Sequence, residues 1–305
     1  MQYGISILLS GISLGGQYAL IAIGYTMVYG ILRLINFAHG DIFTVAGFLM
    51  VYATASLPLT ISIPLVVVAT VLLGIAVEKI AYKPLRTAPR MSVMISAIGV
   101  SYLLQNVALY VTGGLAKMYP TIPWISNTVT IGTATTKVVT IITPILTLVL
   151  VIALVTFIQK TKIGMAMRAV AKDFETSQLM GIKINKVISV TFIIGSFLAA
   201  VGSLLYFTNY PTVIPTSGAM PGLKAFVAAV FGGIGSIPGA VIGAFIIGIC
   251  ENIIKGLDLI LFKAGITHKM LGLTTFSDAF TFVLLIVILI IKPTGLFGEK
   301  TTDKV

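Results

Sequence analysis

Long apolar runs separated by short polar segments make up most of the chain. A helix needs about 20 apolar residues to cross a bilayer, and several of the runs reach that length. The pattern therefore predicts an all-α polytopic membrane protein with about eight or nine transmembrane helices, some of them interrupted. We expect residues 1–305 to form a single transmembrane domain. The apolar runs occupy residues 3–32, 42–57, 61–77, 92–111, 138–158, 187–207, 223–250 and 278–291.

Composition and charge support this interpretation. Hydrophobic residues make up 57% of the chain and charged residues 10%, with a net charge of +11, whereas soluble domains carry about 25% charged residues. The positive charge lies in short loops between apolar runs, as membrane topology requires, so we expect a lipid bilayer and no nucleic acid as partner. The same rule places loops 78–90 and 160–186 in the cytoplasm and segment 112–137, which contains Trp124, outside. The first cation is Arg33, so the N-terminal run is expected to be retained rather than cleaved as a signal.

The loop at residues 160–186 is unusually long and polar, with six Lys and Arg residues against two acids. We expect it to form a cytoplasmic helix of about 16 residues between Gly164 and Gly181, too short to cross the bilayer. Its apolar face must be buried, either on lipid headgroups or on another protein, and the pattern leaves both open. The residues of this face follow the i, i+3, i+4, i+7 period: Met167, Val170, Ala171 and Phe174.

A polar turn interrupts the first two apolar runs. At membrane depth, ionisable side chains are expensive and are found facing a cavity or a partner, which would make them candidates for the translocation pathway. At the level of the lipid headgroups they would only be solvated, and the sequence is compatible with both positions. The candidates are Asn36, His39, Gly40 and Asp41.

A second interruption lies in the run 223–250, where several glycines and a proline would break a helix. Broken helices in transporters often lie on the pathway, in corresponding places of two repeats. The turn at 36–48 is a faint counterpart, so an inverted repeat is possible. A tight helical hairpin without a pathway role is the alternative. The candidates here are Gly232, Gly233, Gly235 and Pro238.

The chemistry that the sequence lacks narrows its function. Two histidines and one cysteine cannot supply a His/Cys metal cluster, so we expect no metal site. The sequence has no GxxxxGK[ST] phosphate loop. We therefore expect a protein that is not an enzyme, binds no cofactor directly and has no ATP site of its own.

Four segments of the chain carry recognisable motifs. Glu175 and Gly181 have an E-x-x-x-x-x-G spacing, and the other three segments are Leu34-Ile-Asn-Phe-Ala-His-Gly-Asp41, Lys224-Ala-Phe-Val-Ala-Ala-Val-Phe-Gly-Gly-Ile-Gly-Ser-Ile-Pro-Gly239 and Lys292-Pro-Thr-Gly-Leu-Phe-Gly298. Together they resemble the LivH-type permease subunit of branched-chain amino acid ABC transporters. The first spacing is similar to that of the EAA loop of ABC importer permeases, with Thr176 and Ser177 where alanines are usual.

The resemblance implies a transport subunit of a bacterial cytoplasmic (inner) membrane importer for leucine, isoleucine, valine or related amino acids. Its partners would be a second, LivM-like permease, two ABC ATPase subunits that use the ATP, and an external substrate-binding protein. The loop 160–186 would dock on an ATPase. Met167 and Phe174 would supply buried apolar contacts there, with Arg168, Asp173 and Glu175 at the rim and Gly164 and Gly181 at the ends of the helix.

A self-sufficient secondary carrier or channel for a small solute is the alternative. The broken helices and the missing ATP site would suit it. It would leave the amphipathic loop without a role, and acids that could bind a coupling ion are scarce inside the apolar runs.

Overall fold

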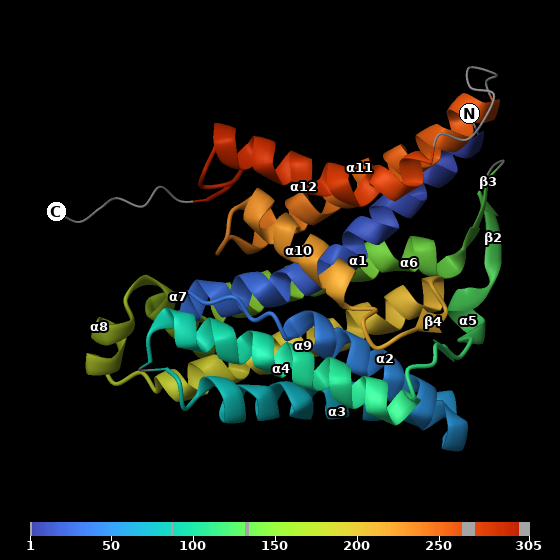
Figure 1. The fold of residues 1–305 in the computed structure, drawn as a ribbon. Coiled ribbons are helices and arrows are strands. Elements are labelled where there is room, and N and C mark those ends of the chain that lie inside the picture. Colours follow the sequence, from blue (N-terminus) through green and yellow to red (C-terminus); the bar gives the residue numbers. More distant parts are fainter. Residues whose placement is uncertain (1, 87, 132–133, 264–271, 299–305) are drawn as a thin grey trace.

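The computed structural model describes residues 2–86, 88–131, 134–263 and 272–298 (Figure 1). Within these residues it is helical, apart from two small antiparallel sheets, β1–β4 and β2–β3. The α-helices are α1 (Gln2–Leu32), α2 (His39–Ser56), α3 (Leu59–Val77), α4 (Arg90–Thr112), α5 (Pro123–Ser126), α6 (Val138–Lys160), α7 (Lys162–Lys172), α8 (Phe174–Leu179), α9 (Ile184–Asn209), α10 (Ala219–Gly232), α11 (Ile237–Lys263) and α12 (Leu273–Ile291). A π-helical turn, η1 (Glu78–Tyr82), follows α3, and the strands are β1 (Lys117–Met118), β2 (Thr128–Ile131), β3 (Ala134–Lys137) and β4 (Thr212–Val213).

Six helical segments in the described part of the chain are long and apolar enough to cross a membrane, and the apolar helices Ala219–Gly232 and Thr275–Ile291 are shorter. The prediction of an all-α polytopic membrane protein is confirmed, whereas the number of complete crossings, predicted as eight or nine, stays a prediction. The six segments are Gly4–Leu32, Leu59–Tyr82, Met91–Thr112, Val138–Lys160, Ile184–Asn209 and Ile237–Asp258.

The molecule has two distinct ends (Figure 1). One end holds α7, α8 and the turn between α10 and α11; the other holds the strands and α5. At the first end, the Arg33 guanidinium donates to the Ala171 carbonyl at 3.1 Å, and a Cβ atom at Gly30 would lie 4.0 Å from the Cα atom of Gly235. The described part of the C-terminal segment reaches this end too, since the Leu296 amide donates to the Phe231 carbonyl.

Helices α1 and α11 run antiparallel in close contact. A Cβ atom at Gly11 would lie 2.9 Å from the Cα atom of Ile249, and one at Gly15 would lie 2.7 Å from the Cα atom of Phe245. Only glycine permits this approach, because any side chain would collide with the neighbouring backbone.

Two helices begin inside the protein, and they enter from opposite ends. After α1, Arg33 takes a left-handed φ of 54° and the chain turns back into the interior, where α2 begins at His39. After β4, the chain enters from the other end and α10 begins at Ala219. The two starts touch, because a Cβ atom at Gly222 would lie 3.1 Å from the Cα atom of Gly40.

The packing of these helices is that of an inverted repeat. Helices α2 and α3 pack against α9, while α10 and α11 pack against α1. The pair α2 and α4 is in contact, as is the pair α10 and α12. The structure corrects one detail: we expected the turn at 36–48 to correspond to the Gly232 break. It instead corresponds to the interior start of α10.

The loop at residues 160–186 contains two helices, not the single helix of about 16 residues that we predicted. The chain breaks at Asp173, with φ −148° and ψ 108°, and the Asp173 carboxylate accepts a hydrogen bond from the Thr176 amide at 3.0 Å. Aspartate favours this position because its side chain satisfies an amide that the first helical turn leaves unpaired. Gly164 lies inside α7, not at its start, whereas Gly181 follows α8 with a left-handed φ of 81°.

Candidate coupling surface and membrane-depth polar sites

Helix α7 buries the apolar stripe that the sequence revealed, but it buries it inside this chain. Met167 is 4% exposed and Val170 2% exposed, because α7 packs against α1, α6 and α9. The expectation that Met167 meets a partner is therefore wrong for this conformation. Arg168 remains exposed and donates to the Gln159 carbonyl at 3.2 Å.

Helix α8 and the residue after it present apolar side chains to the outside. Phe174 is 41% exposed, Leu179 87% and Met180 78%, and we call these three residues the α8 apolar surface. Glu175 is exposed beside Phe174, and Asp173 caps the helix. We did not predict Leu179 and Met180, because the break at Asp173 ends the helical period on which the prediction rested.

Hydrogen bonds and ion pairs join this end of the protein to the helices of the membrane domain. Arg86, in the segment between η1 and α4, pairs with Glu78 and donates to Asn185 at the start of α9. Glu78, only 1% exposed, also accepts from the Ser189 hydroxyl at 3.0 Å. A cavity of about 240 Å³ opens here, and its lining includes Ile31, Leu32, Arg33, Leu34, Tyr82, Arg86, Val93 and Phe174.

The polar turn before α2 is buried in the interior of the protein. Asn36, His39 and Asp41 are 1–3% exposed. The Tyr82 hydroxyl donates to Asn36 Oδ1 at 2.8 Å, and Asp41 accepts from Ser101 at 2.5 Å and from Gln105 at 2.9 Å.

His39 is tightly enclosed by helices of this chain. Its ring lies against Gly24 on α1, 3.6 Å from where a Cβ atom of Gly195 on α9 would lie, and edge-on to Tyr25 with centroids 5.2 Å apart. No hydrogen-bond partner for His39 Nε2 is found among the described residues. Gly40 is equally enclosed, at the contact with α10. A place on the pathway would require these helices to separate, and it stays a prediction.

The second predicted interruption is real, but it lies at one end of the molecule. Helix α10 ends at Gly232, and Gly233 and Gly235 take left-handed φ values of 107° and 98°. The Phe297 amide donates to the Gly232 carbonyl at 2.9 Å, so the motif 292–298 closes the end of α10. Pro238 lies exposed in the first turn of α11. This geometry is that of the tight hairpin that the sequence left open as an alternative.

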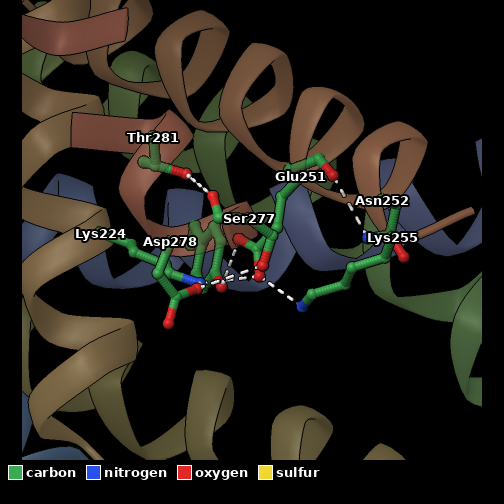
Figure 2. A network of polar contacts seen from close by, with 9 residues as sticks. Lys224, Glu251, Asn252, Lys255, Ser277, Asp278 and Thr281 are labelled. Atoms are coloured by element: carbon green, nitrogen blue, oxygen red, sulfur yellow. Dashed lines mark hydrogen bonds and ion pairs between the residues drawn. The ribbon is translucent and has the colours of Figure 1, made fainter. Parts of the chain in front are cut away.

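A partly buried cluster of charged side chains and one tyrosine hydroxyl joins α1, α10, α11 and α12, and the sequence analysis missed it (Figure 2). The Lys224 ammonium lies 2.7 Å from Glu251 Oε1 and 2.6 Å from Asp278 Oδ1. Lys255 contacts the same Glu251 oxygen at 2.5 Å, and the Tyr18 hydroxyl donates to Glu251 Oε2 at 3.0 Å. Two signals could have revealed it: a lone lysine inside an apolar run, and the i, i+4 spacing of Glu251 and Lys255.

Comparisons with known proteins match nearly the whole chain to one family of permeases. Residues 7–289 match the family model described as "Branched-chain amino acid transport system / permease component". The chain is 36% identical over 311 residues to the high-affinity branched-chain amino acid transport system permease protein BraD of Pseudomonas aeruginosa, covering 98% of this chain and 97% of that protein. It is also 36% identical over 316 residues to the LivH permease proteins of Salmonella typhimurium and Escherichia coli K12, covering 99% of this chain and 98% of each.

Proposed function

The chain belongs to the family of branched-chain amino acid transport system permease components, and on this premise we propose that it is the transmembrane permease subunit of an ABC importer for these amino acids. It would lie in the bacterial cytoplasmic (inner) membrane with α7 and α8 on the cytoplasmic side. This orientation is supported by the cations of loops 78–90 and 160–186. The subunit would bind no cofactor itself, and its partner subunits would hydrolyse the ATP.

The observation that carries the proposal is the α8 apolar surface, three large apolar side chains exposed at the predicted cytoplasmic end. Exposed apolar groups rimmed by polar ones are typical of protein interfaces. Phe174 would enter a cleft of the ATPase, with Arg168, Asp173 and Glu175 at the rim. Gly181 follows α8 with a left-handed backbone conformation that glycine adopts readily, so α8 remains a short helix.

The remaining partners follow from the same premise. A second, LivM-like permease would complete the membrane domain, and a second ATPase would complete the ATP-hydrolysing pair. An external binding protein would deliver the amino acid to the opposite end, which carries β1 to β4 and α5.

The predicted pathway residues would border the route when the two halves of the inverted repeat move apart. Asn36, His39, Gly40 and Asp41 lie where α2 and α10 begin, and helix starts inside a membrane protein often point at the transported solute. The turn with Gly232, Gly233, Gly235 and Pro238 would lie at the cytoplasmic exit of that route.

Purification from native membranes in mild detergent tests the assembly. We expect an ABC ATPase and a second permease to copurify, with ATP hydrolysis that the binding protein and a branched-chain amino acid stimulate in liposomes. Recovery of the chain alone, transporting an amino acid without ATP, would instead favour a secondary carrier.

A double substitution tests the coupling surface. Phe174→Ala with Glu175→Lys should leave the protein inserted but reduce substrate-stimulated ATP hydrolysis by about tenfold or more, the effect of losing interface anchors. Tyr110→Ala, which alters a side chain 90% exposed on α4, is the control and should change little. Normal stimulation in the double variant would rule out this surface.

A further inference from the structure

The charged cluster of Tyr18, Lys224, Glu251, Lys255 and Asp278 lies near the middle of the membrane domain. Tyr18 and Glu251 are each about fourteen residues from the cytoplasmic end of their helices, and Asp278 about thirteen from the end of α12. At a rise of about 1.5 Å per residue this is roughly 20 Å from that end, within a hydrocarbon core of about 30 Å. Charges at this depth are found where they serve a function or face a partner.

The two carboxylates of the cluster have different surroundings. Glu251 is 1% exposed and is occupied by both lysines and by the Tyr18 hydroxyl. Asp278 is 44% exposed and contacts the Lys224 ammonium through one oxygen. Glu251 therefore has the surroundings of a structural group, whereas Asp278 is accessible from outside the chain.

The face that exposes Asp278 is unsuited to lipid. Asp278 is the only charged residue of α12, and Lys224 is the only one of α10. Helix α10 follows an irregular segment, and irregular backbone at membrane depth must be covered by protein or line a water-filled cavity. This face therefore meets either the second permease or the pathway between the subunits.

Apolar and aromatic groups flank the ion pair. Met220, one turn before Lys224 on α10, is 41% exposed, and Tyr210 is 45% exposed. Burial and the Glu251 carboxylate raise the pKa of Tyr210, and Lys224 lowers it, so the phenol lies within electrostatic reach of the cluster. Opposite charges beside an apolar surface match an amino acid, which carries an ammonium and a carboxylate on one carbon and a side chain beyond it.

We propose that Lys224 and Asp278 form a transient binding site for the α-amino acid zwitterion during translocation. Asp278 accepts hydrogen bonds from the substrate ammonium, Lys224 donates to the substrate carboxylate, and the apolar side chain packs on Met220. Binding of the substrate thus replaces the Lys224–Asp278 ion pair by two new pairs, one between Asp278 and the substrate ammonium and one between Lys224 and the substrate carboxylate. No charge is left unpaired in this low-dielectric region, where an unpaired charge would be strongly unfavourable. The inference rests on the proposed function and adds to it the residues that recognise the substrate backbone.

The test compares the two carboxylates in the assembled transporter in liposomes. We expect Asp278→Asn to lower the amino acid transported per ATP hydrolysed by about tenfold, as the loss of one charge-assisted hydrogen bond predicts, with an unchanged melting temperature. Glu251→Gln, the structural control, should lower the melting temperature. An unaltered transport ratio in Asp278→Asn would overturn the site. Wild-type complex that moves no branched-chain amino acid would instead overturn the proposed function.

Cysteine accessibility decides the case in which Asp278→Asn is unstable. With Cys250 replaced by serine, Met220→Cys should react with a water-soluble maleimide, and isoleucine with its binding protein should slow the reaction during ATP turnover. Leu72→Cys, 60% exposed on the apolar helix α3, is the matched control for a lipid-facing position and should stay unlabelled. Met220→Cys that is inert, or labelled equally with and without substrate, would make the cluster a structural ion-pair network.

Discussion

At the residue scale, Gly24 on α1 packs tightly against His39 at the start of α2. A Cβ atom at Gly24 would overlap the imidazole ring. The ring cannot retreat, because Gly195 of α9 faces it at short distance and Tyr25 lies against its edge. Glycine at position 24 is thus required by the enclosure of His39.

We predict that Gly24→Ala lowers the free energy of unfolding by about 1–3 kcal/mol, the usual effect of overfilling a packed interior. Thermal melting of the purified protein in detergent measures it. Gly99→Ala is the matched control, because a Cβ atom there meets nothing within 4 Å and alanine favours the helix. Equal melting temperatures for the two variants would contradict the packing argument.

Sequence patterns identified some polar residues of the interior and missed others. Asn36, His39 and Asp41 were visible because they interrupt two apolar runs, but only the fold could show that they are buried. Lys224 and Asp278 lie in different helices far apart in the chain, and their pairing depends on how α10 meets α12. Local periodicity holds no information about such contacts.

At the scale of elements, the break at Asp173 separates a buried helix from an exposed one. The prediction of one helix failed because an apolar period continued to Phe174 across a residue that favours a helix start over a helix interior. Met167 and Val170 are buried while Phe174 is exposed, so the two helices present their apolar residues to different surroundings. The prediction of long spanning helices held, since their runs contain enough apolar residues to outweigh local signals.

The cap on α8 gives a prediction at this scale. Asp173→Ala removes the acceptor for the Thr176 amide and should destabilise α8 by about 1 kcal/mol. We expect transport per ATP hydrolysed to fall severalfold, because a loosened α8 would transmit ATPase motion less completely. Asp173→Asn keeps a capping oxygen and should behave like the wild type. Equal losses in both variants would show that the charge of Asp173 matters instead of the cap.

At the scale of the whole molecule, the inverted repeat places the starts of α2 and α10 against each other in the interior. Opening the protein alternately to each side therefore requires the halves to part near Gly40 and Gly222. The sequence suggested the repeat but paired the wrong segments, because glycines mark both an interior helix start and a surface hairpin. Only the path of the chain distinguishes the two.

This arrangement predicts that accessibility at the polar turn depends on turnover. In a variant with Cys250 replaced by serine, Asn36→Cys should resist a water-soluble maleimide at rest, because the position is 1% exposed. During ATP hydrolysis with binding protein and substrate it should react, since separation of the halves admits water there. Ala199→Cys, fully buried on α9, is the control and should stay inert in both states. If Asn36→Cys also stays inert during turnover, Asn36 and its neighbours only pack the interior, and the route must follow the face that exposes Asp278.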